Sequence, residues 1–181
     1  MRPRVAASAT VLLILAGLVA PGQRQAQRPD QRAGTQWREV QSKEVNLRFR
    51  LPAEWQTKPA TAGGRPCLDA ISPNSTIYLH ACSFRDSDLT LDDLLDRTLD
   101  DLGVDLDDDP SEEHLNGLDA LVGEATTDFY GRQLGMFIVV ASYGDIRYAI
   151  YVMTKADLFD ANARTMNRIV DSLAPLATAG K

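Results

Sequence analysis

Four residues with reactive or metal-binding side chains lie in the segment CLDAISPNSTIYLHAC, at Cys67, Asp69, His80 and Cys82. They include both cysteines and one of the two histidines of the chain. Together they could form a disulfide, bind a zinc ion, or supply a thiol nucleophile with a neighbouring base. The choice depends on whether the fold brings these side chains together.

The residues between the cysteines predict a β-hairpin. The stretch from Pro73 to Thr76 fits a type I turn, because the fixed φ of proline suits the second position of such a turn. The resulting register places Cys67 opposite Cys82. It also places Asp69 opposite His80. Since side chains two residues apart share one sheet face, all four are expected on the same face.

The first 22 residues match the three-part pattern of a secretory signal peptide. Arg2 and Arg4 precede an apolar run over residues 11–20, and small residues follow it. Leu18 occupies the position where a bacterial lipoprotein would carry its lipid-bearing cysteine. We therefore expect a mature protein that begins near Gln23, is periplasmic or secreted, and has no stable membrane anchor.

A disulfide between Cys67 and Cys82 is the interpretation we favour, because exported proteins fold in oxidising compartments. It would close a loop of about fifteen residues and stabilise the fold by about 3 kcal/mol. Zinc remains an alternative, although structural zinc sites usually use tighter Cys-x-x-Cys spacings. A thiol enzyme is the other alternative, but neither a Cys-x-x-Cys motif nor a second nearby histidine supports it.

The chain is expected to form a single domain. Residues 23–36 contain no large apolar side chain and are predicted to be a disordered linker. Residues 37–176 are expected to form the one folded domain, because a chain of 181 residues suffices for one well-packed core. Residues 177–181 are predicted to be a flexible tail.

The first two elements of this domain show different hydrophobic periods. Apolar residues alternate with polar ones at residues 45–51, which predicts a strand with one solvated face. At residues 91–102 the period is near 3.6, which predicts an amphipathic helix. Thr90 is its expected N-cap and Gly103 its expected end.

The second half of the chain predicts a meander followed by a helix. Strands are expected at residues 118–129, 134–143 and 146–154, and the helix should begin at Asp157 and end before Pro175. The middle strand is almost continuously apolar, which indicates that layers cover both faces of the sheet. The fold class is therefore α+β, with an antiparallel sheet and helices packed against it.

Acidic residues are concentrated in one segment. Residues 86–113 contain thirteen acidic residues and one arginine, whereas the net charge of the whole chain is -6. Such a charge disfavours nucleic acid as a partner. A run of charges is most often a solvated surface without a partner, and docking of a basic protein is the functional interpretation. The candidate partner-binding residues are Asp92, Asp93, Asp96, Asp100 and Asp101.

The loop after this helix could bind calcium through Asp105, Asp107 and Asp109, which occupy alternate positions. It differs from an EF-hand loop at two decisive positions. Pro110 stands where the glycine belongs, and Asn116 stands where the bidentate glutamate belongs. Calcium binding by this loop is thus an alternative function to partner docking.

The sequence contains none of the motifs of nucleotide-binding, metalloprotease or serine-hydrolase sites. No nucleophile and base can be assembled from the remaining residues. We therefore expect no cofactor and no enzymatic activity.

The segment FRLPAEW, residues 49–55, resembles the opening motif of the PsbP-like and DcrB-like family of exported bacterial and thylakoid-lumen proteins. The segment GDIRYAIYVMTKADLFD and the later MNRIVDSL resemble the final strand and helix of that family. The resemblance implies an α/β/α sandwich around an antiparallel sheet. It also implies a non-enzymatic binding or assembly factor, in which Pro52 and Trp55 are structural positions.

Overall fold

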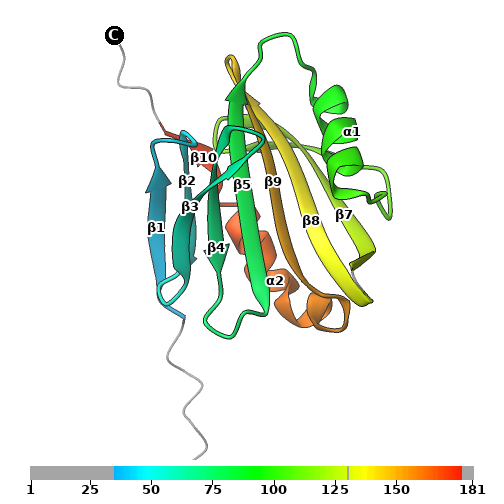
Figure 1. The fold of residues 1–181 in the computed structure, drawn as a ribbon. Coiled ribbons are helices and arrows are strands. Elements are labelled where there is room, and N and C mark those ends of the chain that lie inside the picture. Colours follow the sequence, from blue (N-terminus) through cyan, green and yellow to red (C-terminus); the bar gives the residue numbers. More distant parts are fainter. Residues whose placement is uncertain (1–34, 130, 177–181) are drawn as a thin grey trace, which may run out of the picture. The chain divides into compact units, whose positions relative to one another are not determined.

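The computed structural model describes residues 35–129 and 131–176. The predicted signal peptide at residues 1–22, nearly all of the predicted linker and the predicted tail lie outside these residues. The described elements are two antiparallel sheets and two α-helices (Figure 1). No helix among them is long and apolar enough to cross a membrane.

The larger sheet has seven strands in the order β3-β4-β5-β9-β8-β7-β6, and the smaller sheet has the order β1-β2-β10. The strands of the larger sheet are β3 (Gln56–Ala62), β4 (Arg65–Ile71), β5 (Ile77–Arg85), β6 (Ser111–Leu115), β7 (Leu118–Phe129), β8 (Arg132–Tyr143) and β9 (Ile146–Lys155). Those of the smaller sheet are β1 (Trp37–Ser42), β2 (Leu47–Pro52) and β10 (Ala174–Pro175). The predicted meander is confirmed as β7, β8 and β9.

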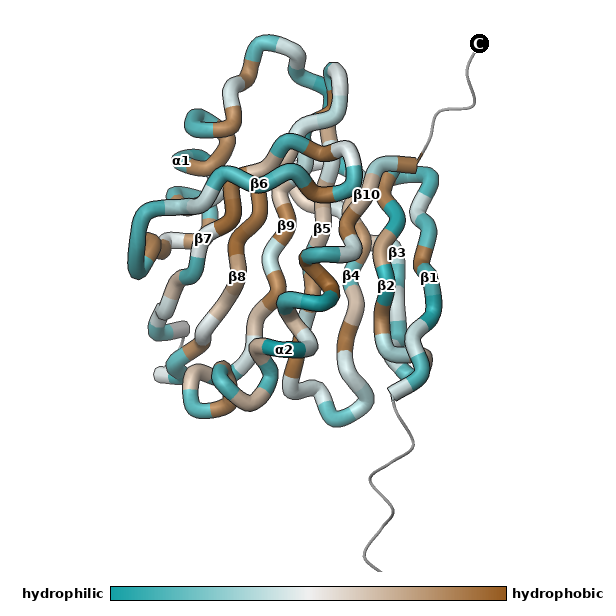
Figure 2. The backbone as a smooth tube through the Cα atoms, turned by 180° about the vertical axis from the view of Figure 1, so that it is seen from behind, coloured by the Kyte–Doolittle hydropathy of each residue, from teal (hydrophilic) through white to brown (hydrophobic). Residues whose placement is uncertain are grey.

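Strand β8 explains how both faces of the larger sheet are buried, because its side chains alternate between two separate apolar clusters. Phe137 and Val139 belong to the cluster that contains helix α2 (Phe159–Val170) and strand β2. Ile138 belongs to the cluster that contains helix α1 (Leu91–Leu102). Figure 1 shows α1 in front of the sheet, and Figure 2 shows the opposite side, with α2.

The expected combination of an antiparallel sheet with helices is confirmed, but helices alone do not cover both faces of the sheet. The described domain is mostly antiparallel sheet with two helices. On the side of α2, the smaller sheet shares the cover, since Val40, Leu47 and Phe49 bury their side chains in the same cluster as α2. Strand β1 was not predicted, because WREVQS shows no clear alternation of apolar and polar residues.

Helix α1 has the predicted ends. The hydroxyl of Thr90 accepts a hydrogen bond from the backbone amide of Asp93, which caps the N-terminus. Gly103 has φ 67° and ends the helix in the left-handed conformation, and its amide donates to carbonyls of the last turn. Leu94 and Leu95 are buried against the sheet.

Two predictions were wrong, the N-cap of α2 and the absence of a strand after α1. A 3-10 turn at Ala156–Leu158 precedes α2, so Asp157 is not its N-cap, and Leu158 holds that position without a side-chain hydrogen bond. The acidic segment after α1 was predicted to be a loop. Instead, Ser111–Leu115 forms edge strand β6 beside β7, because pairing with a long neighbouring strand can order a segment of low intrinsic β pattern.

Candidate functional site

The hairpin of β4 and β5 brings the four chemically active residues together in the predicted register. Cys67 pairs with Cys82, and Asp69 pairs with His80. At the turn, the hydroxyl of Ser72 accepts hydrogen bonds from two backbone amides and so holds the hairpin closed. The two cysteines form a disulfide with an S–S distance of 2.04 Å.

Asp69 forms hydrogen bonds with Tyr78 and His80 beside the disulfide. The carboxylate oxygen Oδ1 of Asp69 lies 2.7 Å from His80 Nδ1 and accepts a second hydrogen bond, also 2.7 Å long, from the Tyr78 hydroxyl. The other imidazole nitrogen, His80 Nε2, lies 2.9 Å from Cys82 Sγ. Lys58 Nζ lies 3.4 Å from Asp69 Oδ2, so the carboxylate has a cation on its second oxygen.

The surroundings of Asp69 favour its ionised form. Burial raises the pKa of the carboxyl group, but hydrogen bonds from Tyr78 and His80, with a further contribution from Lys58, outweigh burial. The pKa of Asp69 therefore lies below its usual value. Burial, together with the negative charge of Asp69, raises the pKa of Tyr78 and that of Tyr151, so both phenols stay protonated.

The stability that Asp69 contributes is expected to disappear in acid. Because its pKa is lower in the folded than in the unfolded state, the contribution is present above about pH 4 and is lost as the pH falls through the folded pKa. Asp69→Asn should lower the free energy of unfolding by about 2 kcal/mol near pH 6, through lost charge-assisted hydrogen bonds. The loss should be smaller near pH 2, which urea denaturation at both pH values would measure.

Asp119→Asn is the control for this prediction, because Asp119 also accepts a hydrogen bond from a histidine but is exposed. Its effect should stay below about 1 kcal/mol at both pH values. An equal loss for Asp69→Asn near pH 6 and near pH 2 would contradict the proposed ionised state of Asp69.

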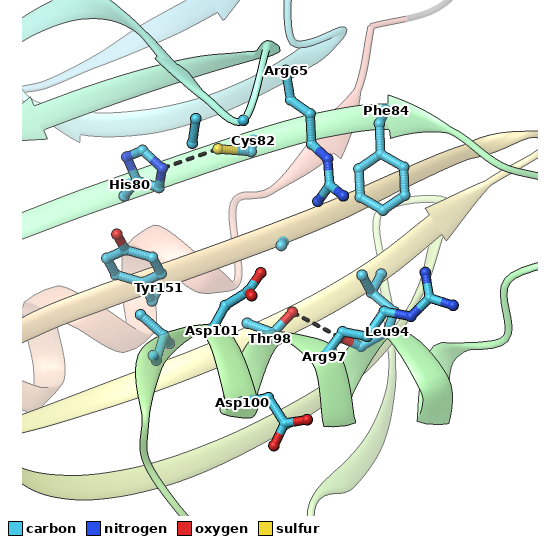
Figure 3. Close-up of a pocket in the computed structure, with 14 residues that line it drawn as sticks. Arg65, His80, Cys82, Phe84, Leu94, Arg97, Thr98, Asp100, Asp101 and Tyr151 are labelled. Carbon is cyan, nitrogen blue, oxygen red and sulfur yellow. Dashed lines mark hydrogen bonds between the residues drawn. The ribbon is translucent and has the colours of Figure 1, made fainter.

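His80 and Cys82 lie in one wall of a groove of about 620 Å³ between α1 and the larger sheet (Figure 3). From the strands and the turn between β3 and β4, it is lined by Ala62, Gly63, Arg65, His80, Cys82, Phe84, Ala149 and Tyr151. From the helix, it is lined by Leu94, Arg97, Thr98, Asp100, Asp101 and Leu102. The guanidinium of Arg65 lies 4.3 Å from the centre of the Phe84 ring, a cation–π contact at the wall.

The sequence did not predict this groove. One available signal was the alternation in β5, which places His80, Cys82 and Phe84 on one face. The missing information was the position of α1, which the sequence describes only as an amphipathic helix. Residues assigned to an outer acidic surface, Asp100 and Asp101, therefore also line the groove.

The predicted partner-binding residues on α1 are all exposed. The carboxylate of Asp93 accepts a hydrogen bond from the hydroxyl of Thr90. Within the described part of the chain, none of the five aspartates has a lysine or arginine partner within 4.0 Å. The acidic face of α1, which we define as Asp92, Asp93, Asp96, Asp100 and Asp101, is thus available to an external cation.

The three predicted calcium ligands are not among the described groups of three potential ligands whose atoms lie within 4.8 Å of one another. Asp105, Asp107 and Asp109 are exposed, and the carboxylate of Asp107 accepts hydrogen bonds from the amide and hydroxyl of Thr126. Among the described residues, the one cluster of three potential metal ligands within 4.8 Å of one another lies elsewhere. It consists of Cys67, His80 and Cys82.

No protein-family model and no curated protein matches this sequence. Solved structures do match the fold. Cyanobacterial PsbP (CyanoP) from Synechocystis sp. PCC 6803 is 15% identical with a TM-score of 0.58, and the alignment covers 78% of this chain and 93% of that protein. LpqN of Mycobacterium tuberculosis, which is involved in cell envelope biogenesis, is 14% identical with a TM-score of 0.55 and coverages of 77% and 90%.

A protein of Bacteroides thetaiotaomicron VPI-5482 is 12% identical with a TM-score of 0.57, and the alignment covers 79% of this chain. Because it covers 49% of the Bacteroides protein, the chain spans about half the length of that relative. At such identities the likeness concerns the fold. The described domain has a PsbP-like fold, as the sequence motifs indicated.

Proposed function

We propose that this protein is an exported, non-enzymatic binding or assembly module that docks a basic protein partner through the acidic face of α1. We take its two helices as the outer layers of an α/β/α sandwich, with α1 as the layer that meets the partner. A periplasmic or secreted location is supported by the N-terminal sequence pattern and by the disulfide. The fold that it shares with LpqN, a protein of cell envelope biogenesis, supports an accessory role.

The observation that carries the proposal is the group of exposed carboxylates on one helix, none of which has a lysine or arginine partner among the described residues. Asp100 and Asp101 lie in the last turn of α1, where the helix dipole is negative and further acid costs about 0.3 to 1 kcal/mol each. No basic residue lies in that turn to offset the cost. A cationic partner surface would relieve the repulsion among these carboxylates.

Reversal of three charges should abolish this docking. We expect the variant Asp96→Lys, Asp100→Lys, Asp101→Lys to lose partner capture in a cross-linked pull-down from the native cell envelope at low salt. Capture by the wild type should itself weaken as salt rises, because exposed charges are screened over about 8 to 10 Å near physiological ionic strength. Near-UV circular dichroism would verify that the variant is folded.

A matched control separates the site from the net charge. The variant Glu44→Lys, Glu54→Lys, Asp157→Lys makes the same change in charge at exposed positions outside α1. It should retain the partner. If both variants lose the partner, net charge rather than the face of α1 is responsible, and if neither loses it, the site lies elsewhere.

Calcium binding by Asp105, Asp107 and Asp109 was the alternative function. No described contact favours it, and Asp107 is engaged by Thr126. Partner docking is therefore the function that we propose.

A further inference from the structure

The cluster of Cys67, His80 and Cys82 has the composition of a zinc site with three protein ligands. Its two sulfur atoms and one imidazole nitrogen all lie within 4.8 Å of one another. Thiolate sulfur and imidazole nitrogen are the preferred ligands of Zn²⁺ and similar thiophilic cations. In the oxidised protein, however, the sulfurs are bonded to each other and cannot act as thiolates.

The orientation of His80 also suits a metal ligand. His80 Nδ1 lies 2.7 Å from Asp69 Oδ1, which also accepts from the Tyr78 hydroxyl, so the geometry suits an imidazole that donates from Nδ1. In the neutral imidazole, the lone pair of Nε2 then faces Cys82 Sγ, 2.9 Å away, and this sulfur carries no proton to donate. Zinc-bound histidines typically show this carboxylate–imidazole arrangement, which fixes the tautomer and the ring.

The surroundings shield the two sulfur atoms from solvent and leave a route by which an ion can reach them. Cys67 and Cys82 are 2% and 7% exposed, so their sulfurs lie where charge interactions are strong. His80 and Cys82 reach the groove between α1 and the sheet, which gives a route for an ion and room for a fourth ligand (Figure 3). The rings of His80 and Tyr151 stack with centroids 5.0 Å apart, which further holds the imidazole in place.

We propose that reduction of the Cys67–Cys82 disulfide converts this cluster into a Zn²⁺ site, with Cys67, Cys82 and His80 as ligands and the fourth position open to the groove. A dithiol reductant would break the S–S bond, becoming a disulfide as it transfers two electrons and two protons. The bound Zn²⁺ would then displace both thiol protons into solvent. Oxidation by a disulfide would release the ion and restore the staple, so the site is gated by redox state.

The test uses Co²⁺ as a spectroscopic substitute for Zn²⁺, added to the full mature chain under anaerobic conditions. After reduction with a phosphine, we expect one equivalent of Co²⁺ to give thiolate-to-cobalt charge-transfer absorption with tetrahedral ligand-field bands. Zn²⁺ should abolish both. Without reduction, the wild type should show neither. No such spectrum in the reduced wild type would overturn the proposal.

Variants assign the ligands. His80→Ala should weaken Co²⁺ binding by at least about tenfold, and Asp69→Asn by about 10 to 100-fold, since the carboxylate orients the ligand. The other histidine, His114, is exposed on β6 and supplies the matched control. His114→Ala should bind Co²⁺ as the wild type does. The same spectrum from Cys67→Ser/Cys82→Ser would also overturn the proposal.

Loss of the staple could unfold the reduced chain, and circular dichroism distinguishes this case. If Zn²⁺ then restores the native spectrum in the wild type but not in His80→Ala, metal binding is coupled to folding and the proposal holds. A reduced chain that stays unfolded with Zn²⁺ would overturn it. If reduced protein is folded without metal, Zn²⁺ should raise its melting temperature but leave that of the oxidised protein unchanged.

Discussion

Replacing Arg147 with methionine is expected to lower the free energy of unfolding by about 3 kcal/mol. Arg147 is only 8% exposed, and its guanidinium donates to the backbone carbonyls of Ser87, Leu89 and Gly144 at 3.0, 2.7 and 2.9 Å. Methionine would fill much of the space but leave these carbonyls without a donor. Each hydrogen bond to a charged group contributes about 1.5 to 3 kcal/mol, partly offset by the cost of burying the charge.

This substitution should also loosen α1. Arg147 holds the segment that leads into the helix, and Leu89 of that segment packs in the same cluster as Leu94 and Leu95. Hydrogen exchange should therefore speed up at the amides of α1 more than at those of β8. Urea denaturation would measure the loss of stability.

Arg85→Met is the control for Arg147→Met. Arg85 is an exposed arginine that forms an ion pair with Asp145 at the same end of the sheet. Exposed ion pairs contribute about 0 to 1 kcal/mol, so this variant should be nearly as stable as the wild type. Equal losses for the two variants would mean that the buried carbonyl contacts of Arg147 contribute nothing particular.

The variant Cys67→Ala/Cys82→Ala should lose about 3 kcal/mol of stability. The disulfide joins residues separated by 15 positions, and a loop of that length restricts the unfolded chain by about this amount in the chain-entropy model. For a chain of this size, the melting temperature should fall by roughly 6 to 12 °C. Differential scanning calorimetry would measure both quantities.

Chemical reduction of the wild type, carried out with a metal chelator, gives an independent measure of the same staple. It should produce a similar loss, because both treatments remove the covalent link while the hairpin hydrogen bonds remain available. A loss below about 1 kcal/mol in the double variant would show that the pairing of β4 with β5 holds the hairpin without help. The staple would then be dispensable for stability.

Local patterns were sufficient for a large part of the fold. The turn after Ser72 defined the register of the cysteine hairpin, since a tight turn leaves one pairing for the residues on either side. Thr90 and Gly103 defined α1, because caps act on the residues next to them. The three strands of the meander follow one another in the chain, so their pairing also depends on short turns.

Elements without a local pattern were not predicted. Six of the seven residues of β3 are exposed, as are four of the five of β6, so neither strand shows alternation. Strand β10 contains only Ala174 and Pro175, and pairs with β2 more than 120 positions earlier in the chain. Such elements exist because a neighbouring strand offers unpaired backbone groups, which no short window of sequence reveals.

Local patterns in the chain are enough to predict the hairpin with its paired cysteines, Asp69 opposite His80, the acidic amphipathic helix and the strands of the meander. The pairing of β5 with β9, and the packing of α1 over the face that carries His80 and Cys82, are seen only in the folded protein. Consequently, Asp100 and Asp101 of the helix line the same groove as Cys82. The physical reason is that turns, caps and periodicity act between residues close in the chain, whereas the packing of layers follows from burying apolar surfaces far apart in it.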